Sequence, residues 1–283
     1  MPISSYIELL KLRIGGMITL TAVVSYLAMT ESVSMVQLLM LCLVMMLGSA
    51  SSAVFNHYYD RDIDRTMERT SSRPLAQGAL EKPQRILWLA AGLLLLGVGL
   101  ATWYFNPIVA LHLFLGAFFY GIVYTVWLKR RTWLNIVIGG LAGSFAVMAG
   151  AASVQPELCA LPLFLALVLF FWTPSHFWSL AIMLKEEYRK VGVPMLPVLI
   201  GNQKTARYVL LNSLLLVASS MLPWIYGKLG LIYAAGAGLS GAVLLYENWL
   251  MVRTPTRAMA RKNFFGSMRY LGLLFIAIVV DTL

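Results

Sequence analysis

Polar side chains recur every four residues in a stretch that separates two long apolar segments. The series consists of Asn56, Asp60, Asp64 and Glu68. Residues four apart lie on one face of a helix, so this spacing predicts a stripe of oxygen ligands. Mg²⁺ binds through a few oxygen ligands and leaves other coordination positions for phosphate oxygens. We therefore expect Asn56, Asp60 and Asp64 to form a Mg²⁺ site.

Arginines repeat at the same spacing, one residue further along the chain. They are Arg61, Arg65, Arg69 and Arg73. On a helix this column lies about 100° around the axis from the acids, and guanidinium groups suit phosphate oxygens. Metal and arginine at the mouth of an apolar bundle indicate a prenyl diphosphate substrate, because both neutralise the charge on departing diphosphate. The alternative is a solvated helix extension whose charges only pair with one another.

The rest of the chain is largely apolar. Apolar residues make up 60% and charged residues 12%, a composition typical of a polytopic membrane protein. Crossing a bilayer takes about 20 apolar residues, and continuous runs near that length predict an all-α fold rather than a barrel. The nine expected spans are 14–30, 36–55, 86–104, 107–127, 133–152, 159–183, 207–226, 229–250 and 265–281. We expect a single transmembrane domain over 1–283, with cytoplasmic motif loops at about 56–85 and 184–206.

Positive charge gathers on one side of the expected bundle. With a cytoplasmic N-terminus, the loops on that side and their flanking helix ends hold every lysine and arginine except Lys228. This asymmetry follows the positive-inside rule and predicts a cytoplasmic N-terminus and an external C-terminus. The net charge of +10 is then a matter of topology, and no nucleic-acid partner is expected. The expected location is a cell membrane, with the active-site loops on the cytoplasmic side.

A second polar cluster follows the sixth apolar run, in WTPSHFWSLAIMLKEEYRKVGVPMLPVL at 172–199. Its loop carries Lys185, Glu187, Tyr188 and Arg189 to the same membrane face as the first motif. Two polar loops on one face could close over a single headgroup. The segment therefore predicts a second wall of the same site.

His176 lies about two turns inside the sixth run, among apolar residues. An ionisable residue inside a membrane span is a candidate functional group. Imidazole could ligate a haem iron or assist proton transfer. The structural alternative is a hydrogen bond to a neighbouring helix, since leaving the ring unpaired is costly. His112 is assigned to packing.

The cytoplasmic segment KRRTWLN supplies further cations after the fourth run. Lys129 and Arg130 are candidate diphosphate contacts, and Asn135 stands just inside the next span. Arg131 is interpreted as a positive-inside anchor.

The stretch NHYYDRDIDRTMERTSSRP, residues 56–74, resembles the NxxxDxxxD motif of the intramembrane polyprenyltransferases, the UbiA superfamily. In its full length it resembles the haem O synthases, or protohaem IX farnesyltransferases. The segments TPSHFWSLAI, YRKVGVPMLPV and LKRRTWLNIVIGGLAGS and the nine-span layout support this narrower match. The resemblance covers nearly the whole chain.

The resemblance implies transfer of a farnesyl group from farnesyl diphosphate to a vinyl group of haem B, with water addition, loss of diphosphate and Mg²⁺ as cofactor. The expected catalytic residues are Asn56, Asp60, Asp64, Lys185, Glu187 and Tyr188. The expected substrate-binding residues are Arg69, Arg73, Lys129, Arg130, Asn135, His176 and Arg189. The lipid bilayer surrounds the protein, and a downstream haem-modifying enzyme or terminal oxidase is a candidate partner.

The sequence departs from the family pattern at two places. Many members carry a second DxxxD motif. In the corresponding loop this chain has adjacent Glu186 and Glu187, so we do not expect a second full metal site. Many also have Lys-Pro before the first span, where this chain reads Lys11-Leu12-Arg13. We expect that difference to affect the start of the first helix and not the chemistry.

Three alternatives stay open on the residues alone. A prenyltransferase with a phenolic or quinone-precursor acceptor would use the same acidic motif. A polytopic transporter would share the fold class, although its coupling residues should lie near the midplane. An oxidase-assembly membrane subunit would not need regularly spaced carboxylates.

Overall fold

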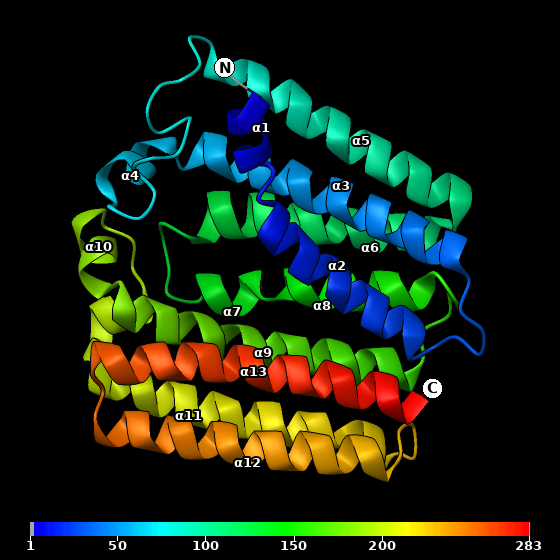
Figure 1. The fold of residues 1–283 in the computed structure, drawn as a ribbon. Coiled ribbons are helices and arrows are strands. Elements are labelled where there is room, and N and C mark those ends of the chain that lie inside the picture. The colour runs from blue at the N-terminus through cyan, green and yellow to red at the C-terminus, as the bar shows by residue number, and fades with distance from the viewer. Residues whose placement is uncertain (1–2, 283) are drawn as a thin grey trace.

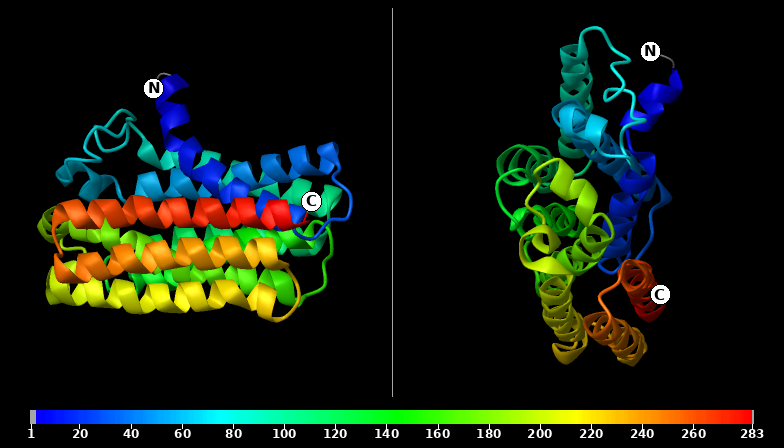
Figure 2. Two further views of the ribbon diagram at one scale, coloured as in Figure 1. Left: turned by 60° about the horizontal axis from the view of Figure 1, so that its bottom comes forward. Right: turned by 90° about the vertical axis from the view of Figure 1, so that its left-hand side faces the viewer.

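Helices account for the secondary structure of residues 3–282, the part of the chain that this computed structural model describes. Long rods lie side by side and their connections gather at the two ends of the bundle (Figures 1 and 2). The long helices are α2 (Leu12–Leu27), α3 (Met35–Tyr59), α5 (Ile86–Tyr104), α6 (Pro107–Phe118), α8 (Leu141–Ala152), α9 (Ala160–Met183), α11 (Leu196–Ile225), α12 (Leu231–Arg253) and α13 (Arg257–Thr282). The all-α expectation is confirmed.

Shorter segments extend or connect these rods. They are α1 (Ile3–Leu9), α4 (Arg61–Thr66), η1 (Pro83–Arg85), η2 (Phe119–Leu128), α7 (Asn135–Gly139) and α10 (Lys185–Lys190). Of these, η2 is a π-helix that continues α6 directly, and α7 leads into α8 across Gly140. Every apolar run of the sequence thus coincides with helix.

Seven helical segments in the described residues are long and apolar enough to cross a membrane. Two further rods fall outside this set: α2 has only 16 residues, and the apolar stretch of α12 is interrupted by Glu247 and Asn248. A multi-pass membrane protein is therefore clear from the helices. Seven spans, rather than nine, meet the criterion of length and composition.

The connections on the motif side contain short helices. The predicted loop 56–85 begins inside α3 and contains α4, and the predicted loop 184–206 contains α10 and the first turns of α11. Within α11 the backbone is non-helical at Gly201, whose φ of 80° suits glycine. The helices extend beyond the apolar runs into both connections, because hydropathy marks only the apolar part of a helix.

The helices pack most closely where α8 meets α2. A Cβ atom added to Gly150 of α8 would lie 2.0 Å from the carbonyl oxygen of Ala22 on α2. Only glycine allows this approach, and small residues serve the same purpose in membrane helix pairs generally. The contact fixes α2 against the middle of the bundle.

An ion pair joins α12 and α13, with its acidic member buried and its arginine half exposed. Arg269 Nη2 donates to Glu247 Oε1 at 2.8 Å, and Glu247 is only 5% exposed. Arg269 stands twelve residues after the start of α13 at Arg257. It is the fifth residue of the expected span 265–281, at the end that faces the motif loops, where its acidic partner pairs with it.

The two C-terminal helices are also joined at the opposite end. Asp281, near the end of α13, accepts hydrogen bonds from the backbone N–H groups of Gly230 and Tyr233. These are orphan donors at the start of α12, so Asp281 acts as the cap that α12 lacks locally.

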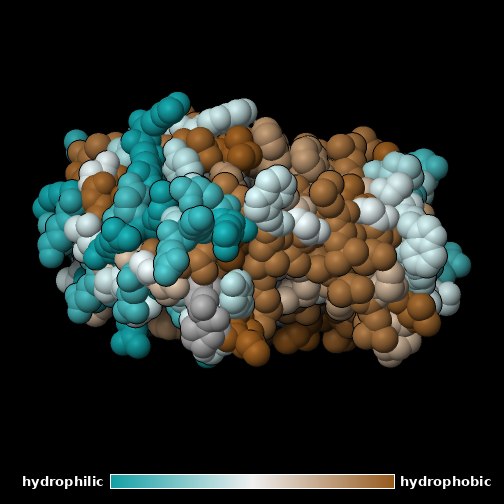
Figure 3. Space-filling model, turned by 90° about the horizontal axis from the view of Figure 1, so that it is seen from above, coloured by the Kyte–Doolittle hydropathy of each residue, from teal (hydrophilic) through white to brown (hydrophobic). Residues whose placement is uncertain are grey.

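Polar and apolar side chains are separated along the bundle. Figure 3 shows hydrophilic residues over the end where α1 and α4 lie and hydrophobic residues over the region beside it. Exposed large apolar side chains such as Trp88, Trp103 and Leu239 cover the rods. The polar end holds the motifs singled out in the sequence.

Candidate active site

Asn56 and Asp60 lie at the end of α3 with both side chains buried, at 3% and 0% exposure. Asn56 Nδ2 donates to Asp60 Oδ2 at 2.7 Å. The two side chains meet because α3 stays helical through Tyr59, so residues four apart share a face. Asn56 Nδ2 also reaches Thr125 Oγ1 on η2 at 3.0 Å, which links the motif to the next rod.

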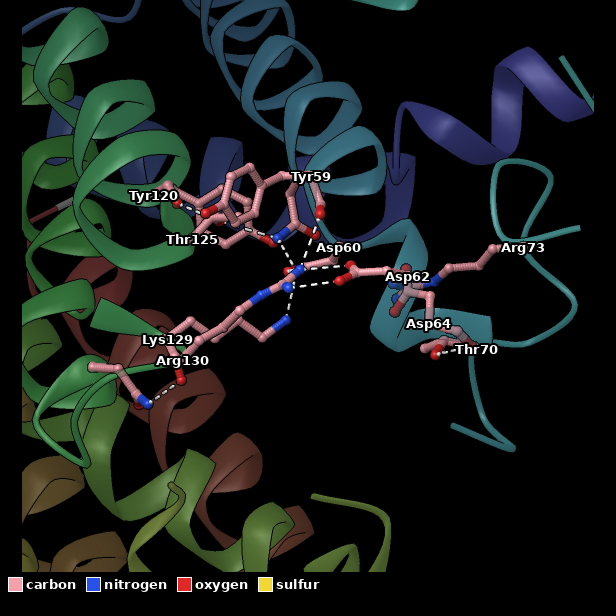
Figure 4. A network of polar contacts seen from close by, with 12 residues as sticks. Tyr59, Asp60, Asp62, Asp64, Thr70, Arg73, Tyr120, Thr125, Lys129 and Arg130 are labelled. Atoms are coloured by element: carbon pink, nitrogen blue, oxygen red, sulfur yellow. Dashed lines mark hydrogen bonds and ion pairs between the residues drawn. The ribbon is translucent and has the colours of Figure 1, made fainter. Parts of the chain in front are cut away.

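The chain does not continue as one helix beyond Asp60. Asp60 leaves helical geometry, α4 lasts six residues, and Met67 is extended. Asp64 still follows Asp60 by one turn, through a backbone bond of 2.8 Å, and is buried at 3% exposure. Its Oδ2 accepts from Arg73 Nη1 at 2.7 Å, because the loop after α4 turns back toward it (Figure 4).

The predicted arginine column is therefore not formed. Arg61 donates to the carbonyl oxygen of Tyr58 and Arg65 donates to that of Ala76, while the Arg69 side chain is exposed. These side chains satisfy local carbonyl groups where the helix breaks, and local bonds of this kind compete with helix continuation. Of the four arginines, Arg73 contacts an acid of the motif.

The π-helical segment η2 supplies two groups to the site. In a π-helix residues five apart share a face, and Thr125 Oγ1 accordingly donates to the carbonyl oxygen of Tyr120 at 2.8 Å. At the end of the segment, Lys129 Nζ lies 2.5 Å from Asp60 Oδ2, with only 13% of its side chain exposed. Asn135 Nδ2 donates to the carbonyl oxygen of Lys129 at 3.1 Å and so supports the turn that carries it.

Arg130 contacts two acids at the junction of α3 and α4. Its two terminal nitrogens each lie 2.7 Å from an oxygen of Asp62, and Nη2 lies 3.5 Å from Asp60 Oδ1 (Figure 4). Hydrogen bonding to Arg130 lowers the pKa of Asp62, and the same contact raises the pKa of Arg130. Asp62, which falls off the four-residue series, is thus held by a bidentate pair outside the buried site.

Lys11 lies at the site, although its position in the sequence did not mark it as a candidate. It connects α1 to α2 with a left-handed φ of 48°, which is uncommon for a residue with a side chain. Its Nζ donates to Asn56 Oδ1 at 2.8 Å and lies 3.4 Å from Tyr120 Oη. Burial, with Arg73 and Lys129 next in effect, lowers its pKa to about 7. A lysine just before the first apolar run was its only sequence signal, and that signal is shared with topology anchors.

The second cluster contacts the first only at its edge. Glu187 Oε2 accepts from the backbone N–H of Arg69 at 3.4 Å, and Tyr188 is buried in an apolar cluster that includes Ile63 and Met67. Arg189 pairs with Glu186 at 2.7 Å on the exposed side of α10. Lys185 starts the same helix. The structure therefore brings Glu187 and Tyr188 to the α4 region and directs Arg189 elsewhere.

His176 lies apart from the carboxylates, between α9 and α13. Its ring is stacked between Trp172 and Phe264, at centroid distances of 4.4 and 4.2 Å. Nδ1 is 2.8 Å from Ser267 Oγ. Both ring faces and one nitrogen are thus occupied, which leaves the other edge of the ring for a ligand.

Oxygen atoms suited to a divalent cation remain within this site. Asp60 Oδ1 is buried with no hydrogen-bond partner, and Asp64 engages Arg73 through only one of its two oxygens. No group of three or more His, Cys, Asp and Glu side chains in the described residues could hold a metal by itself. Any cation here would therefore rely on the Asn56 amide oxygen and on substrate oxygens besides the two aspartates.

The chain is similar in sequence to known prenyltransferases over most of its length. The UbiA prenyltransferase family model matches residues 17–277. Protoheme IX farnesyltransferase 1 of Paramagnetospirillum magneticum is 57% identical over 281 residues, with 99% of each chain covered. Protoheme IX farnesyltransferase of Hahella chejuensis is 40% identical, covering 98% of this chain and 92% of its own.

Solved structures share the fold at low identity. A digeranylgeranylglyceryl phosphate synthase superposes with a TM-score of 0.82 at 21% identity, covering 99% and 98% of the two chains. A UbiA homologue from Archaeoglobus fulgidus bound to DMAPP and Mg²⁺ gives a TM-score of 0.70 at 18% identity, covering 98% and 99%. From the family model and the full-length relatives, this chain belongs to the UbiA prenyltransferase family.

Proposed function

We propose that this enzyme transfers the farnesyl group of farnesyl diphosphate to a vinyl group of haem B, with addition of water, and releases diphosphate. The observation that carries the proposal is the buried Asn56, Asp60 and Asp64 cluster, ringed by Lys11 and other cations. Full-length relatives named protoheme IX farnesyltransferase support the choice of both substrates.

Asn56, Asp60 and Asp64 would hold Mg²⁺ together with the diphosphate. Asp60 Oδ1 supports this assignment, since it is buried, accepts no hydrogen bond and faces Arg130 only from 3.5 Å, which leaves it available to a metal ion. When bound, Mg²⁺ would supply charge neutralisation for the departing diphosphate. The structural neighbour bound to DMAPP and Mg²⁺ shares the fold that carries these residues.

The cations around the acids would bind the diphosphate itself. Lys129 and Arg73 now pair with Asp60 and Asp64, and Lys11 pairs with Asn56. Once a divalent cation shares the acids, these side chains are free to turn toward phosphate oxygens. They would then stabilise the negative charge that grows as the carbon–oxygen bond breaks. Arg69, Arg130 and Asn135 stay proposals as further contacts or supports.

In the proposed reaction one carbon–oxygen bond of farnesyl diphosphate breaks, and a carbon–carbon and a carbon–oxygen bond form on the vinyl group. The bond between C1 of the farnesyl chain and the diphosphate oxygen breaks, and its electron pair leaves with diphosphate. The terminal vinyl carbon of haem B then bonds to C1. Water adds its oxygen to the other vinyl carbon and loses a proton, which gives the hydroxyethylfarnesyl side chain of haem O.

The second cluster and His176 are proposed for the acceptor. Glu187 and Tyr188 border α4, and Lys185 and Arg189 lie on the same short helix, so α10 is positioned to close on bound substrates. The free edge of His176 is the part of that residue that a haem could reach. These roles rest on placement and on the family motifs.

For topology we propose that α2 and α12 complete a set of nine spans, with the N-terminus cytoplasmic and the C-terminus external. The motif loops would then face the cytoplasm of a bacterial cell membrane. A haem-modifying enzyme or a terminal oxidase is the kind of partner that would take up the product.

Purified protein incubated with haem B, farnesyl diphosphate and Mg²⁺ tests the proposal by mass analysis of the haem. We expect one farnesyl group and one hydroxyl group to be added per modified haem. Asp60→Asn should lower turnover by at least about 100-fold, because it removes charge at a site that must hold a cation and leaves Lys129 unpaired. Unchanged turnover in this variant, with the fold intact by circular dichroism, would remove Asp60 from the site.

A further inference from the structure

A cavity opens directly beneath the carboxylate site, between α2, α3, α6 and α8. Apolar side chains form most of its wall, as is usual for small-molecule sites. Lys11 and Tyr120 lie at its upper end, and Lys11 Nζ is the group that contacts Asn56. The cavity and the proposed diphosphate site therefore share a wall.

The depth of the cavity follows from the lining residues of α3. These run from Ala53, next to the motif, through Ser49 to Met45. Met45 precedes Asn56 by eleven residues and Ser49 precedes it by seven, which correspond to about 16 Å and about 10 Å along a helix. An isoprene unit adds four chain bonds of about 1.5 Å, or about 5 Å when extended. Three units fit above Met45, and only two fit above Ser49.

The lower end of the cavity is closed by packed side chains. Met45 is 5% exposed and belongs to a core cluster with Leu113 of α6. Leu113 fills the space beside Gly48, where an added Cβ would lie 2.9 Å from its Cδ2. His112, on the same turn of α6, also lines this end. This end of the cavity is therefore formed by two packed helices, α3 and α6, and not by a movable loop.

We propose that this cavity receives the isoprenoid chain and that Met45 forms the floor that limits the chain to three units. The inference rests on the proposed function for the identity of the reaction, and it adds the residue that determines which prenyl diphosphate is used. Met45 is suited to this position because its flexible side chain fills irregular space at the end of a bound chain. Ser49 marks the level at which the third unit begins.

Two substitutions with opposite effects test the floor. Met45→Ala should deepen the cavity and raise the kcat/KM ratio of geranylgeranyl to farnesyl diphosphate by about tenfold. Ser49→Phe should fill the level of the third unit and raise the ratio of geranyl to farnesyl diphosphate by about tenfold or more. Ser49→Leu adds less volume and should shift the same ratio by a smaller factor, which covers the case that the phenylalanine variant does not fold.

The second cavity of the bundle provides matched controls. It lies between α2, α8, α9 and α13 and is lined by Thr21 and Leu165, among others. Leu165→Ala and Thr21→Phe make comparable changes in volume there and should leave both ratios unchanged. If these variants shift the ratios and the Met45 and Ser49 variants do not, the chain occupies the second cavity and the inference is wrong.

Binding measurements separate this inference from the proposed reaction. Affinities for geranyl, farnesyl and geranylgeranyl diphosphates are measured with Mg²⁺ and without haem, and inorganic diphosphate serves as the chain-free probe. Met45→Ala and Ser49→Phe should change the order of the prenyl affinities while the affinity for inorganic diphosphate stays constant. An unchanged order contradicts the floor, whereas absence of haem modification with an altered order contradicts only the proposed reaction.

Discussion

Asp60 is the most heavily contacted acid of the site. Its carboxylate receives Asn56 and Lys129 on one oxygen and faces Arg130 from 3.5 Å on the other. Asp64 has the single partner Arg73. Taking charges out of water is tolerated when they are paired, so the cations stabilise the acids before any substrate arrives. A diphosphate must then exchange partners with these acids, and a divalent cation makes that exchange favourable.

The four-residue spacing correctly predicted that Asn56 and Asp60 are neighbours. It did not predict which cations pair with the acids of the motif. Spacing predicts contacts along one helix, and it held from Asn56 to Asp60 because the helix continues there. It failed for the arginines because the helix breaks near Asp60 and the chain folds back to bring Arg73 to Asp64. Contacts between distant segments, such as Lys11 with Asn56, leave no periodic signal in a sequence.

Replacing Lys11 tests its place in the site. Lys11→Met keeps the apolar stem and removes the charge that reaches Asn56 Oδ1. A hydrogen bond to a charged group contributes about 1.5–3 kcal/mol, so KM for farnesyl diphosphate should rise by about 10- to 100-fold. Steady-state kinetics at saturating haem would measure this change.

Arg13→Met is the matched control for Lys11→Met. Arg13 is exposed, two residues further along the chain, and has the same sign of charge. The Arg13→Met substitution should leave KM for farnesyl diphosphate within about twofold of the unmodified enzyme, because exposed charges contribute little to binding. Equal effects of the two substitutions would mean that Lys11 acts only through net positive charge.

At the scale of elements, η2 decides which side chains of the fourth rod face the acids. Its ten residues have the π-helical repeat, so Thr125 shares a face with Tyr120, and Lys129 shares one with Tyr124. An α-helical interpretation would pair residues three or four apart and direct Lys129 differently. Hydropathy located this rod well, but no simple pattern distinguishes a π-helix from an α-helix. That is why Thr125 was missed.

The contact between α2 and α8 should be sensitive to a single methyl group. Gly150→Ala places a Cβ against the backbone of Ala22, where no side-chain rotation can relieve the overlap. We expect a loss of about 3 kcal/mol in stability and a lower unfolding temperature in detergent. Thermal unfolding followed by intrinsic fluorescence would measure it.

Gly99→Ala on α5 is the appropriate comparison for Gly150→Ala. A Cβ at Gly99 meets nothing within 4 Å, so this substitution should be neutral or slightly stabilising through better helix propensity. A similar drop in unfolding temperature for both variants would show that close approach of backbones is not the cause.

At the scale of the whole molecule, composition alone was sufficient for the class of fold. Continuous apolar runs located each rod because lipid demands internally satisfied backbones over a fixed thickness. Two features of the fold could not be predicted from hydropathy. Ends of helices beyond the hydrocarbon follow no apolar pattern, and a charge pair between two helices, such as Arg269 with Glu247, leaves no periodic signal.

The orientation of the bundle can be tested around α12, which falls outside the set of seven apolar spans. With Cys42 and Cys159 replaced by serine, Lys228→Cys and Thr254→Cys place one exposed thiol at each end of α12. An impermeant maleimide should label Lys228→Cys in intact cells and Thr254→Cys only in inverted vesicles. Labelling of both from one side would mean that α12 does not cross the membrane.

The bond from Asp281 to the start of α12 has a consequence for biosynthesis. The residue that caps α12 is made 51 residues after Gly230, the first residue it caps. At about 5–20 residues per second, the ribosome adds this stretch in about 3–10 s. During that interval the first amide groups of α12 can donate only to water. The last two helices are therefore expected to be inserted first and locked together only when Asp281 arrives.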